Sequence, residues 1–327
     1  MAANSRPRPG SIKCDVQILR YRRIVLLAAL FSLTAYAGKK NKDDETQVLD
    51  LPKDPPMVAI GETSRLVFHV APLSAKGLLS QQTRDALKAI LKANGGAQVV
   101  HIRAFVAGSG DLRRVPQIVS EVFTAKKMTL PSVSVVLAGG LPLENAQVAI
   151  EAISVGKRDV NRNGLAFVEA ASPDELASKL AGAVPVKVSC FVSSLESANA
   201  IEARFQSAAV NVVQTQRAPA RPGSSCEAVA RGGNVRTSRL AFSGTQVAFG
   251  PDEKAADLAF QRLDRELGAA GVQPRDVIET RVYALSERSG DLARRIYKGR
   301  GPLMIIPFEG VASVDGAFAV DAIAALP

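Results

Sequence analysis

Two spacings of apolar residues alternate along most of the chain. Apolar positions three and four residues apart predict helices at Ser80–Ala93, at Val115–Ala125 and around Ala256–Leu267. Short runs rich in Val, Ile and Phe fall between these helices, and they predict strands such as Ser132–Leu137 and Gln147–Val155. The resulting order is strand, helix, strand, helix, strand, strand. This order predicts an α+β fold in which helices cover one face of a sheet and leave the other face bare.

Matching motifs show that this order of elements is repeated in the chain. Three motifs of the first copy recur in the last copy, in the same order and at a nearly constant offset. Thr63–Phe68 matches Thr237–Phe242, Ser109–Leu112 matches Ser289–Leu292, and Ile150–Ser154 matches Val320–Ala324. Chance similarity would not preserve both the order and the offset three times, so the two copies are predicted to have one fold.

A third, shorter copy lies between these two. Gly164–Phe167 corresponds to the first motif, and Cys226–Ala230 corresponds to the last. The first helix of this copy is short, Asp174–Leu180, with Ser172 as its cap and Pro173 at its first position. The predicted units are 57–157, 160–233 and 234–327.

The first 37 residues have the features of a targeting segment. Arg20–Arg23 is a basic flank, Ile24–Leu33 is an apolar run, and Ala35–Ala37 fits a signal-peptide cleavage site. The run is shorter than the roughly 20 apolar residues of a spanning helix, which favours a cleaved signal peptide over a short membrane anchor. A retained anchor and a buried helix of the folded body are the alternatives. Residues 38–56 are predicted to be a linker, and the protein is predicted to be exported to the periplasm or secreted.

Charge and composition exclude one class of partner. The chain has 327 residues, of which 47% are hydrophobic, and 41 Lys and Arg stand against 31 Asp and Glu. Six of the bases and one of the acids lie in the first 37 residues, so the rest of the chain is nearly balanced. A protein that binds nucleic acid would show a dense basic stripe with interleaved aromatic residues. No such stripe follows Lys42, and no nucleic-acid partner is expected.

Two cysteines remain if the signal is removed together with Cys14. Cys190 and Cys226 both lie in strand-like runs, and an oxidising compartment would allow them to form a disulfide. The interpretation favoured from the sequence is two small buried side chains, and the disulfide is left open as the alternative.

The third unit carries the clearest family resemblance. Leu240–Gln246 on an opening strand, Ala259–Ile278 over a helix and loop, and Val320–Ala324 on a closing strand follow one another in an order that resembles the Rid family. These proteins are reactive intermediate deaminases, also called YjgF-like. The first unit adds Leu130-Pro131 before a strand. Family members are homotrimers with a chorismate-mutase-like fold and ligand clefts between subunits. The resemblance therefore implies an intramolecular pseudo-trimer that stays monomeric, with clefts between its units.

The resemblance also implies a reaction, the hydrolysis of enamine and imine intermediates to keto acids and ammonia. The family uses an Arg that grips the substrate carboxylate with its guanidinium fork. Counting back 17 residues from the last acid of each unit, with one extra residue in the first, places this Arg at Val133, Val210 and Met304. All three residues are apolar, so no catalytic residue is expected. Each inter-unit cleft is predicted either to collapse or to accept a small uncharged ligand.

Three further residues are candidate ligand contacts. Ser243 and Gly244 keep the Ser-Gly pair that the family has on its opening strand, and Arg221 lies in a Pro-x-Arg sequence. Strand spacing places Arg221 in an exposed loop between two closing strands. The predicted function is that of an exported Rid-like pseudoenzyme, a binding or scaffold module whose partner is a small ligand or an envelope protein. The alternative is residual imine deaminase activity in one inter-unit cleft.

No metal or other cofactor is expected from the sequence. His69 and His101 are the only histidines, and neither has a Cys or acid at ligand spacing. The acid that recurs as Glu151, Glu227 and Asp321 occurs singly in each unit, and it is interpreted as a structural carboxylate at a strand end.

Overall fold

The strands form three sheets in the part of the chain that the structure describes, residues 51–326 apart from 109, 181 and 299–300. The structure is a computed structural model. The predicted signal or anchor, 1–37, lies outside the described residues, as does most of the predicted linker. Residues 50–327 form one compact unit, and the sheets belong to it.

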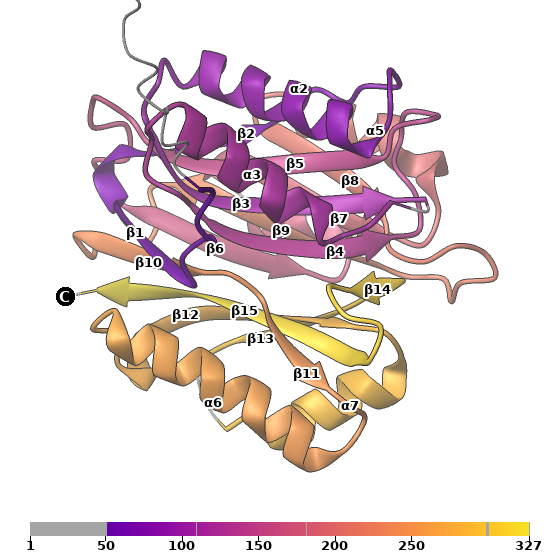
Figure 1. Cartoon of the computed structure of the whole chain (residues 1–327). Coiled ribbons are helices and arrows are strands. Elements are labelled where there is room, and N and C mark those ends of the chain that lie inside the picture. The colour runs from indigo at the N-terminus through magenta and orange to yellow at the C-terminus, as the bar shows by residue number, and fades with distance from the viewer. Residues whose placement is uncertain (1–50, 109, 181, 299–300, 327) are drawn as a thin grey trace, which may run out of the picture. The chain divides into compact units, whose positions relative to one another are not determined.

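The first sheet is built from the segment between Leu66 and Val155. Its strands are ordered β2-β5-β3-β4, and its helices α2 and α3 cover one face (Figure 1). The elements are β2 (Leu66–Val70), α2 (Leu79–Ala93), β3 (Gln98–Ala107), α3 (Arg114–Ala125), β4 (Ser132–Ala138) and β5 (Val148–Val155). Both helices begin within one residue of their predicted starts, because apolar side chains three and four apart face the sheet.

The second sheet has the order β6-β9-β7-β8. Its elements are β6 (Leu165–Ala170), α4 (Pro173–Lys179), β7 (Val184–Val192), a 3₁₀ turn η2 (Leu195–Ser197), α5 (Ala198–Arg204), β8 (Ala209–Gln214) and β9 (Ser224–Arg231). The short helix predicted after Ser172 is confirmed as α4. The side chain of Ser172 accepts a hydrogen bond of 3.1 Å from the backbone N–H of Glu175.

This cap provides a measurable contribution to stability. Ser172→Ala is expected to lower the free energy of unfolding by about 1 kcal/mol, because the N–H of Glu175 loses its acceptor. Urea unfolding of the full chain measures the change. Ser172→Asp keeps an acceptor at the same place and should unfold at nearly the same urea concentration as the wild type. Equal losses in both variants would show that the cap has no role.

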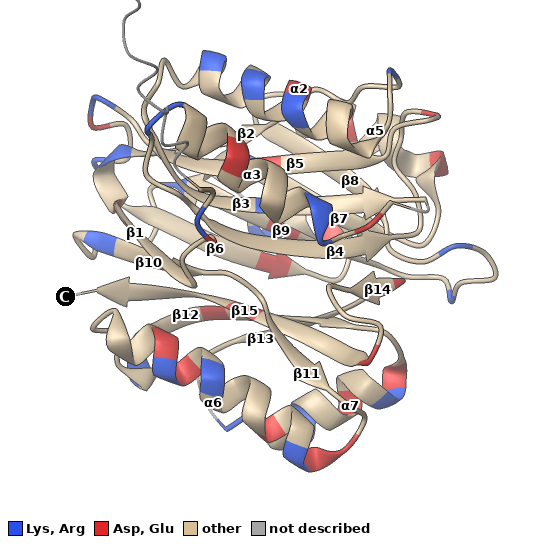
Figure 2. Cartoon of the chain, in the orientation of Figure 1, with Lys and Arg blue, Asp and Glu red and all other residues tan. Residues whose placement is uncertain are grey.

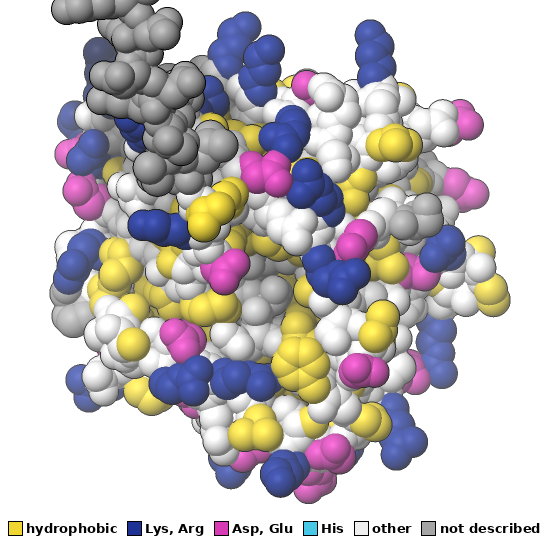
Figure 3. Space-filling model, in the orientation of Figure 1, with side chains coloured by type: hydrophobic (Ala, Val, Ile, Leu, Met, Phe, Trp, Pro, Cys, Tyr) yellow, Lys and Arg dark blue, Asp and Glu magenta, His cyan; other side chains and the backbone are white. Residues whose placement is uncertain are grey.

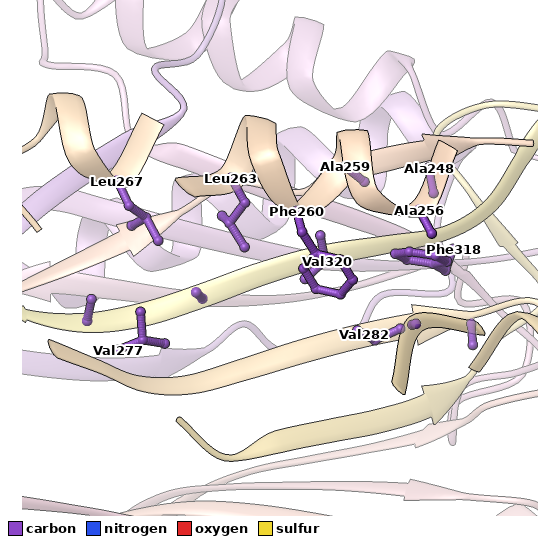
Figure 4. Packing of buried hydrophobic residues seen from close by; sticks show 14 of the residues in the cluster. Ala248, Ala256, Ala259, Phe260, Leu263, Leu267, Val277, Val282, Phe318 and Val320 are labelled. Carbon is purple, nitrogen blue, oxygen red and sulfur yellow. The ribbon is translucent and has the colours of Figure 1, made fainter. Parts of the chain in front are cut away.

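The third sheet has the order β10-β15-β12-β13, with β11 also paired to β15. Its elements are β10 (Arg239–Ser243), β11 (Gln246–Phe249), α6 (Glu253–Ala269), a 3₁₀ turn η3 (Pro274–Asp276), β12 (Val277–Ala284), α7 (Glu287–Ile296), β13 (Leu303–Pro307) and β15 (Gly316–Leu326). In α6, Phe260, Leu263 and Leu267 point toward the strands below (Figure 4). The ring of Phe260 lies 5.9 Å from that of Phe318 on β15.

All three sheets share one strand order. In each, the opening strand pairs antiparallel with the closing strand, which pairs antiparallel with the second strand, which pairs parallel with the third. Two short strands cross between sheets: β1 (Val58–Glu62), which precedes the turn η1 (Thr63–Arg65), pairs with β10, and β14 (Gly310–Val311) pairs with β4. The first and third sheets are therefore interlocked through backbone hydrogen bonds.

Each sheet buries both of its faces. One face packs on its own helices, in three separate apolar clusters. The opposite face packs on the other sheets, where Leu66, Leu165 and Leu240 from the three opening strands meet in one cluster. A second cluster of this interior contains Phe105, Phe191 and other aromatic residues. The sheets thus cover one another where the helices leave them bare.

The outer surface carries both signs of charge. Lys, Arg, Asp and Glu alternate along α6 and α7 (Figure 2), and on the face shown in Figure 3 basic and acidic side chains are interspersed. Among the helices within residues 51–326, none has the length and hydropathy needed to cross a bilayer.

Candidate functional site

Charged side chains fill the region where the three sheets meet. Arg103, Ser189 and Arg281 occupy equivalent positions on the central strands β3, β7 and β12. Directly opposite them on the closing strands lie the three recurrent acids, Glu151, Glu227 and Asp321. Side chains two residues apart on a strand share a face, so Lys187 and Glu279 face the same interior. We call this set the ionic cluster: Arg103, Lys187, Arg281, Glu151, Glu227, Glu279 and Asp321, all of them buried.

Arg103 connects all three sheets. Its Nη2 donates to Glu151 at 2.7 Å on its own sheet and to Glu227 at 2.5 Å on the second sheet. Its Nη1 lies 3.5 Å from the hydroxyl of Tyr283 on the third sheet. The guanidinium also lies over the rings of Phe105 and Phe191, at 5.1 and 5.5 Å from their centroids. A side chain that is 2% exposed therefore has most of its donors satisfied by groups from different sheets.

Two further cations complete the bridges between sheets. Lys187 of β7 contacts Glu151 of the first sheet at 2.7 Å and Glu227 of its own sheet at 2.9 Å. Arg281 of β12 donates to Glu227 at 2.8 Å, which joins the third sheet to the second. Glu227 thus receives a cation from each of the three sheets.

Neutral polar groups donate to two of the recurrent acids as well. Ser189 and Asn211 donate to Glu151 at 2.6 and 2.7 Å. Ser134 of the first sheet and Tyr283 of the third donate to Asp321 at 2.6 and 2.9 Å. These bonds show why the recurrent acid is retained in every unit. It is a structural group, as the sequence interpretation held, but it lies buried within the closing strand and not at a strand end.

The cluster fixes the ionisation of two of its acids. Burial alone would raise the pKa of Glu151, but Arg103 and Lys187 hold this pKa at about 2. Burial also acts on Glu227, where Arg103, Arg281 and Lys187 hold the pKa well below its usual range. Both carboxylates are therefore charged at neutral pH, and they occupy the guanidinium donors that a substrate carboxylate would need.

Glu279 differs from the other acids of the cluster. Burial is the largest influence on it, and Glu227 and Glu169 add repulsion, so that its pKa rises to about 7 despite the attraction of Arg281. Its Oε1 lies 2.5 Å from Nε of Arg281, in an ion pair that lacks hydrogen-bond geometry. The cluster has four acids and three cations, and a neutral Glu279 makes these charges equal.

The raised pKa predicts a pH dependence of stability. The folded state binds the Glu279 proton up to about pH 7, whereas the unfolded state releases it near 4.5. The folded state therefore holds more protons between these values, and the contribution of Glu279 to stability falls as pH rises through this window. Glu279→Gln cannot ionise. The stability of this variant relative to the wild type, measured as the difference between their urea midpoints, should increase from pH 5 to pH 8. A difference that stays constant over this range would refute the raised pKa of Glu279.

The interior leaves no room for a substrate. Arg103, Lys187, Arg281 and Glu151 border an internal cavity of about 20 Å³, which suffices for one water molecule. The bonds of the ionic cluster thus join the three sheets, and the cavity beside it has the size of one water molecule.

Val133 and Val210 occupy equivalent positions in the first and second sheets. Val133 faces Ile102 across the β3–β4 ladder, and Val210 faces Val188 across the β7–β8 ladder. Both side chains pack into the apolar cores on the helix side of their own sheets. Neither side chain lies in the shared interior between the sheets.

Met304 does not share this position, and the alignment that placed it there is wrong by one residue. Leu303 faces Thr280 across the β12–β13 ladder, and it packs against the helix-side core of its own sheet. Met304 faces Arg281 and points into the shared interior, as Ser134 and Asn211 do in the other sheets. The closing segment of the third unit is one residue longer than the counting assumed, and this shift reverses the face of the side chain.

Ser243 and Gly244 lie beside Val133, at a closed contact between β10 and β4. The buried hydroxyl of Ser243 accepts a hydrogen bond of 2.8 Å from the backbone N–H of Ala322. A Cβ atom on Gly244 would lie 2.7 Å from the carbonyl oxygen of Val133, so only glycine allows this approach. Ser132 donates to the carbonyl of Phe242 at 2.8 Å and joins the two strands directly. Protein atoms therefore fill the space between β10 and β4 at Ser243 and Gly244.

Arg221 lies in the exposed loop between β8 and β9, as the strand spacing predicted. It forms an ion pair with Glu287 at the start of α7, and 81% of its side chain is accessible to solvent. The structure does not bring Arg221 to Ser243 or Gly244, so these three candidates do not form one site.

An open groove lies between the first and second units. It lies between β2 of the first sheet and β8 of the second, both of them edge strands, and has a volume of about 410 Å³. Its walls are mainly apolar and include Val70, Ala71, Val210 and Val212. Among its lining residues only Glu202 carries a charge. The groove therefore has no cation with which to hold a carboxylate.

Cys190 and Cys226 form a disulfide, which corrects the preference for two free cysteines. The antiparallel ladder of β7 and β9 places the two residues directly opposite each other, with Cα atoms 4.2 Å apart. Both side chains are fully buried. Cross-strand register could not be known from the positions of the two residues in separate strands.

The two histidines have structural partners. Nδ1 of His101 lies 3.0 Å from the hydroxyl of Ser132, and burial together with nearby Arg281 lowers the pKa of His101 to about 3. Nε2 of His69 lies 2.7 Å from the hydroxyl of Ser154, and burial lowers its pKa as well. Within the described residues, no three His, Cys, Asp or Glu side chains are grouped so as to hold a metal ion.

A pattern in the sequence could have indicated part of the ionic cluster. Aligning the central strands places Arg103 and Arg281 at one position, opposite the recurrent acid of the closing strand. Charges at matched positions inside otherwise apolar strands indicate buried ion pairs. This pattern would have predicted the pairs within a sheet, although not the bonds from one sheet to the next.

Some solved structures are similar to this chain. No family model and no curated protein sequence matches the chain. A member of the YjgF/YER057c/UK114 family from Mycobacterium tuberculosis is 22% identical over 27% of this chain and 79% of its own, with a TM-score of 0.24. A chorismatase is 10% identical over 80% of this chain and 99% of its own, with a TM-score of 0.25. Cyanuric acid hydrolase from A. caulinodans is 11% identical over 80% of this chain and all of its own, with a TM-score of 0.24. All of these TM-scores are below 0.5, and all of the identities are below 25%.

Proposed function

We propose that the chain is a binding module without imine deaminase activity, and that its ligand is a small uncharged molecule held in the groove between β2 and β8. The observation that carries this proposal is the groove itself, which is open, largely apolar and without a lining cation. Its volume of about 410 Å³ falls within the range of small-molecule sites. A keto-acid or imino-acid substrate would need a guanidinium or ammonium partner there.

The scaffold of this module is, in our proposal, an intramolecular pseudo-trimer of Rid-type units at 57–157, 160–233 and 234–327. The shared strand order of the three sheets supports it. The ionic cluster supports it as well, because Glu227 receives cations from all three sheets. Linking the units in one chain would make their association independent of protein concentration.

An imine hydrolysis assay tests the absence of the reaction. 2-Iminopropionate, generated in the cuvette by an amino acid oxidase, is followed by its absorbance with and without the purified full chain. We expect the decay to proceed at the uncatalysed rate. Faster decay that is abolished by Arg221→Ala or Ser243→Ala would instead establish a residual deaminase and overturn the proposal.

Binding of a neutral dye tests the groove. Nile red should gain fluorescence with the wild-type chain, because the groove offers apolar walls to an uncharged ring system. Gln206 is exposed and lines the groove, so Gln206→Trp should fill it and remove most of the signal. Gln117→Trp places the same side chain on the exposed face of α3 and serves as the matched control. Equal fluorescence in both variants would contradict binding in the groove.

We further infer that the module is exported. The buried disulfide supports this inference, because disulfides persist in oxidising compartments and are rare in reducing ones. The intact mass of the protein isolated from its cells distinguishes the two forms of export. Loss of residues 1–37 would show a cleaved signal, whereas their retention in a membrane fraction would show an anchor that presents the module to an envelope partner.

A further inference from the structure

Three turns meet around a polar pocket of about 620 Å³. The pocket is lined by the segments 62–64, 161–164 and 236–239, each of which leads into the opening strand of one sheet. Thr63-Ser64 and Thr237-Ser238 are the beginning of the motif that recurs in the sequence. The repeat therefore brings equivalent turns from all three units to one place. This pocket is separate from the groove between β2 and β8.

Hydrogen bonds between the turns fix the shape of the pocket. The backbone N–H of Thr63 donates to the carbonyl of Ser238 at 3.0 Å, and that of Asn161 donates to the carbonyl of Ser64 at 2.9 Å. The buried side-chain amide of Asn161 donates to the carbonyl of Thr63 at 3.0 Å. Each unit is thus bonded to another at the pocket wall, and little ordering remains to be done when a ligand binds.

The charges that line the pocket are not balanced. Arg162, Arg236 and Arg239 are exposed, and within the described residues none of them forms an ion pair or a side-chain hydrogen bond. Glu62 lies opposite Arg239 in the β1–β10 ladder, but its carboxylate pairs with Arg65 at 3.0 Å. Three unpaired guanidinium groups therefore line one concave surface, where their mutual repulsion favours a bound anion.

Neutral donors stand beside these cations. The amide of Asn163 and the hydroxyl of Ser238 also line the pocket, and neither side chain has a hydrogen-bond partner within residues 51–326. A guanidinium fork matches two oxygens of a phosphate or carboxylate group, and amide and hydroxyl donors add single bonds. The residues that line the pocket are mostly charged or polar, which favours a charged ligand over an apolar one.

We propose that this pocket binds a small multivalent oxyanion, a molecule that carries two or more phosphate or carboxylate groups. Cations contributed by the second and third units would then contact separate groups of one ligand. A single carboxylate could engage only one of them at a time. The ligand would stabilise the junction of the three units, since its contacts come from more than one of them.

Isothermal titration calorimetry of the full chain, which measures the heat of binding, tests the site with three probes. Tripolyphosphate and citrate separate phosphate chemistry from carboxylate chemistry, and acetate is the monovalent control. At least one multivalent probe should bind, and acetate should not. Arg162→Ala and Arg236→Ala should each weaken the binding about fivefold, because an exposed ionic contact contributes roughly that factor. The double variant should lose about 25-fold.

Arg113→Ala is the matched control, since Arg113 is an exposed arginine that follows the far end of β3 and does not line the pocket. It should bind the probe as the wild type does. The thermal midpoints of all variants without probe should agree, because the replaced side chains are exposed. Absence of heat with both tripolyphosphate and citrate at millimolar concentration would overturn the proposal. Unchanged affinity in the Arg162→Ala, Arg236→Ala double variant would overturn it as well.

Discussion

Arg103→Met is expected to lower the free energy of unfolding by about 3–5 kcal/mol, the usual cost of removing one partner from a buried ion pair. The substitution removes one of the two cations that Glu151 and Glu227 share and leaves only Lys187 between them. Methionine keeps much of the volume of the side chain, so the loss reports on charge more than on a cavity. Urea unfolding at pH 7 measures it.

Two further variants make this experiment decisive. Arg103→Lys keeps the charge but has no fork to reach both carboxylates, and it should lose an intermediate amount of stability. Arg265→Met removes an arginine that is 70% exposed and forms an ion pair with its neighbour Glu266, and it should unfold as the wild type does. A loss in Arg103→Met no larger than that in Arg265→Met would mean that the ionic cluster does not hold the sheets together.

Removing the disulfide should produce the second large effect. The Cys190→Ala, Cys226→Ala double variant loses a crosslink between residues 36 apart in the chain. The crosslink lowers the conformational entropy of the unfolded chain, which for a loop of this length stabilises the folded state by about 3–4 kcal/mol. For a body of this size, the thermal midpoint should fall by about 5–7 °C. Differential scanning calorimetry measures the shift.

A reductant provides the internal control for the disulfide. Both sulfur atoms are buried, so reduction requires unfolding, and wild-type protein unfolded and refolded in dithiothreitol should melt near the double variant. The double variant itself should not respond to dithiothreitol. If the wild type melted at the same temperature with and without the reductant, the two cysteines would not be paired.

Local structure was largely predictable from the sequence because it depends on neighbours in the chain. Helix α3 begins one residue before its predicted start and ends where predicted, since Val115, Ile118 and Phe123 have the spacing of one helical face. Helix α4 was found from its cap at Ser172. Both features are encoded within a few residues, and propensity and capping determine them.

Properties that depend on strand register were not predictable in the same way. Met304 was assigned to the wrong face because a shift of one residue between β13 and β15 exchanges the two sides of a strand. The pairing of Cys190 with Cys226 depends on the β7–β9 register, which no local pattern specifies.

The ionic cluster was missed for a related reason. Three of its four acids were visible as a recurrent residue, but several of their partners lie on other sheets. Ser134 contacts Asp321 across 187 residues, and Arg103 contacts Glu227 across 124. Contacts of this kind follow from the assembly of three units, and no single unit encodes them.

The mass of the protein in solution tests the central claim most directly. If the three sheets complete one another within a single chain, light scattering after size exclusion should give one copy, 34.5 kDa or slightly less after signal cleavage, at every concentration. A stable species of three times this mass would show that each chain needs two others, and it would contradict the intramolecular pseudo-trimer.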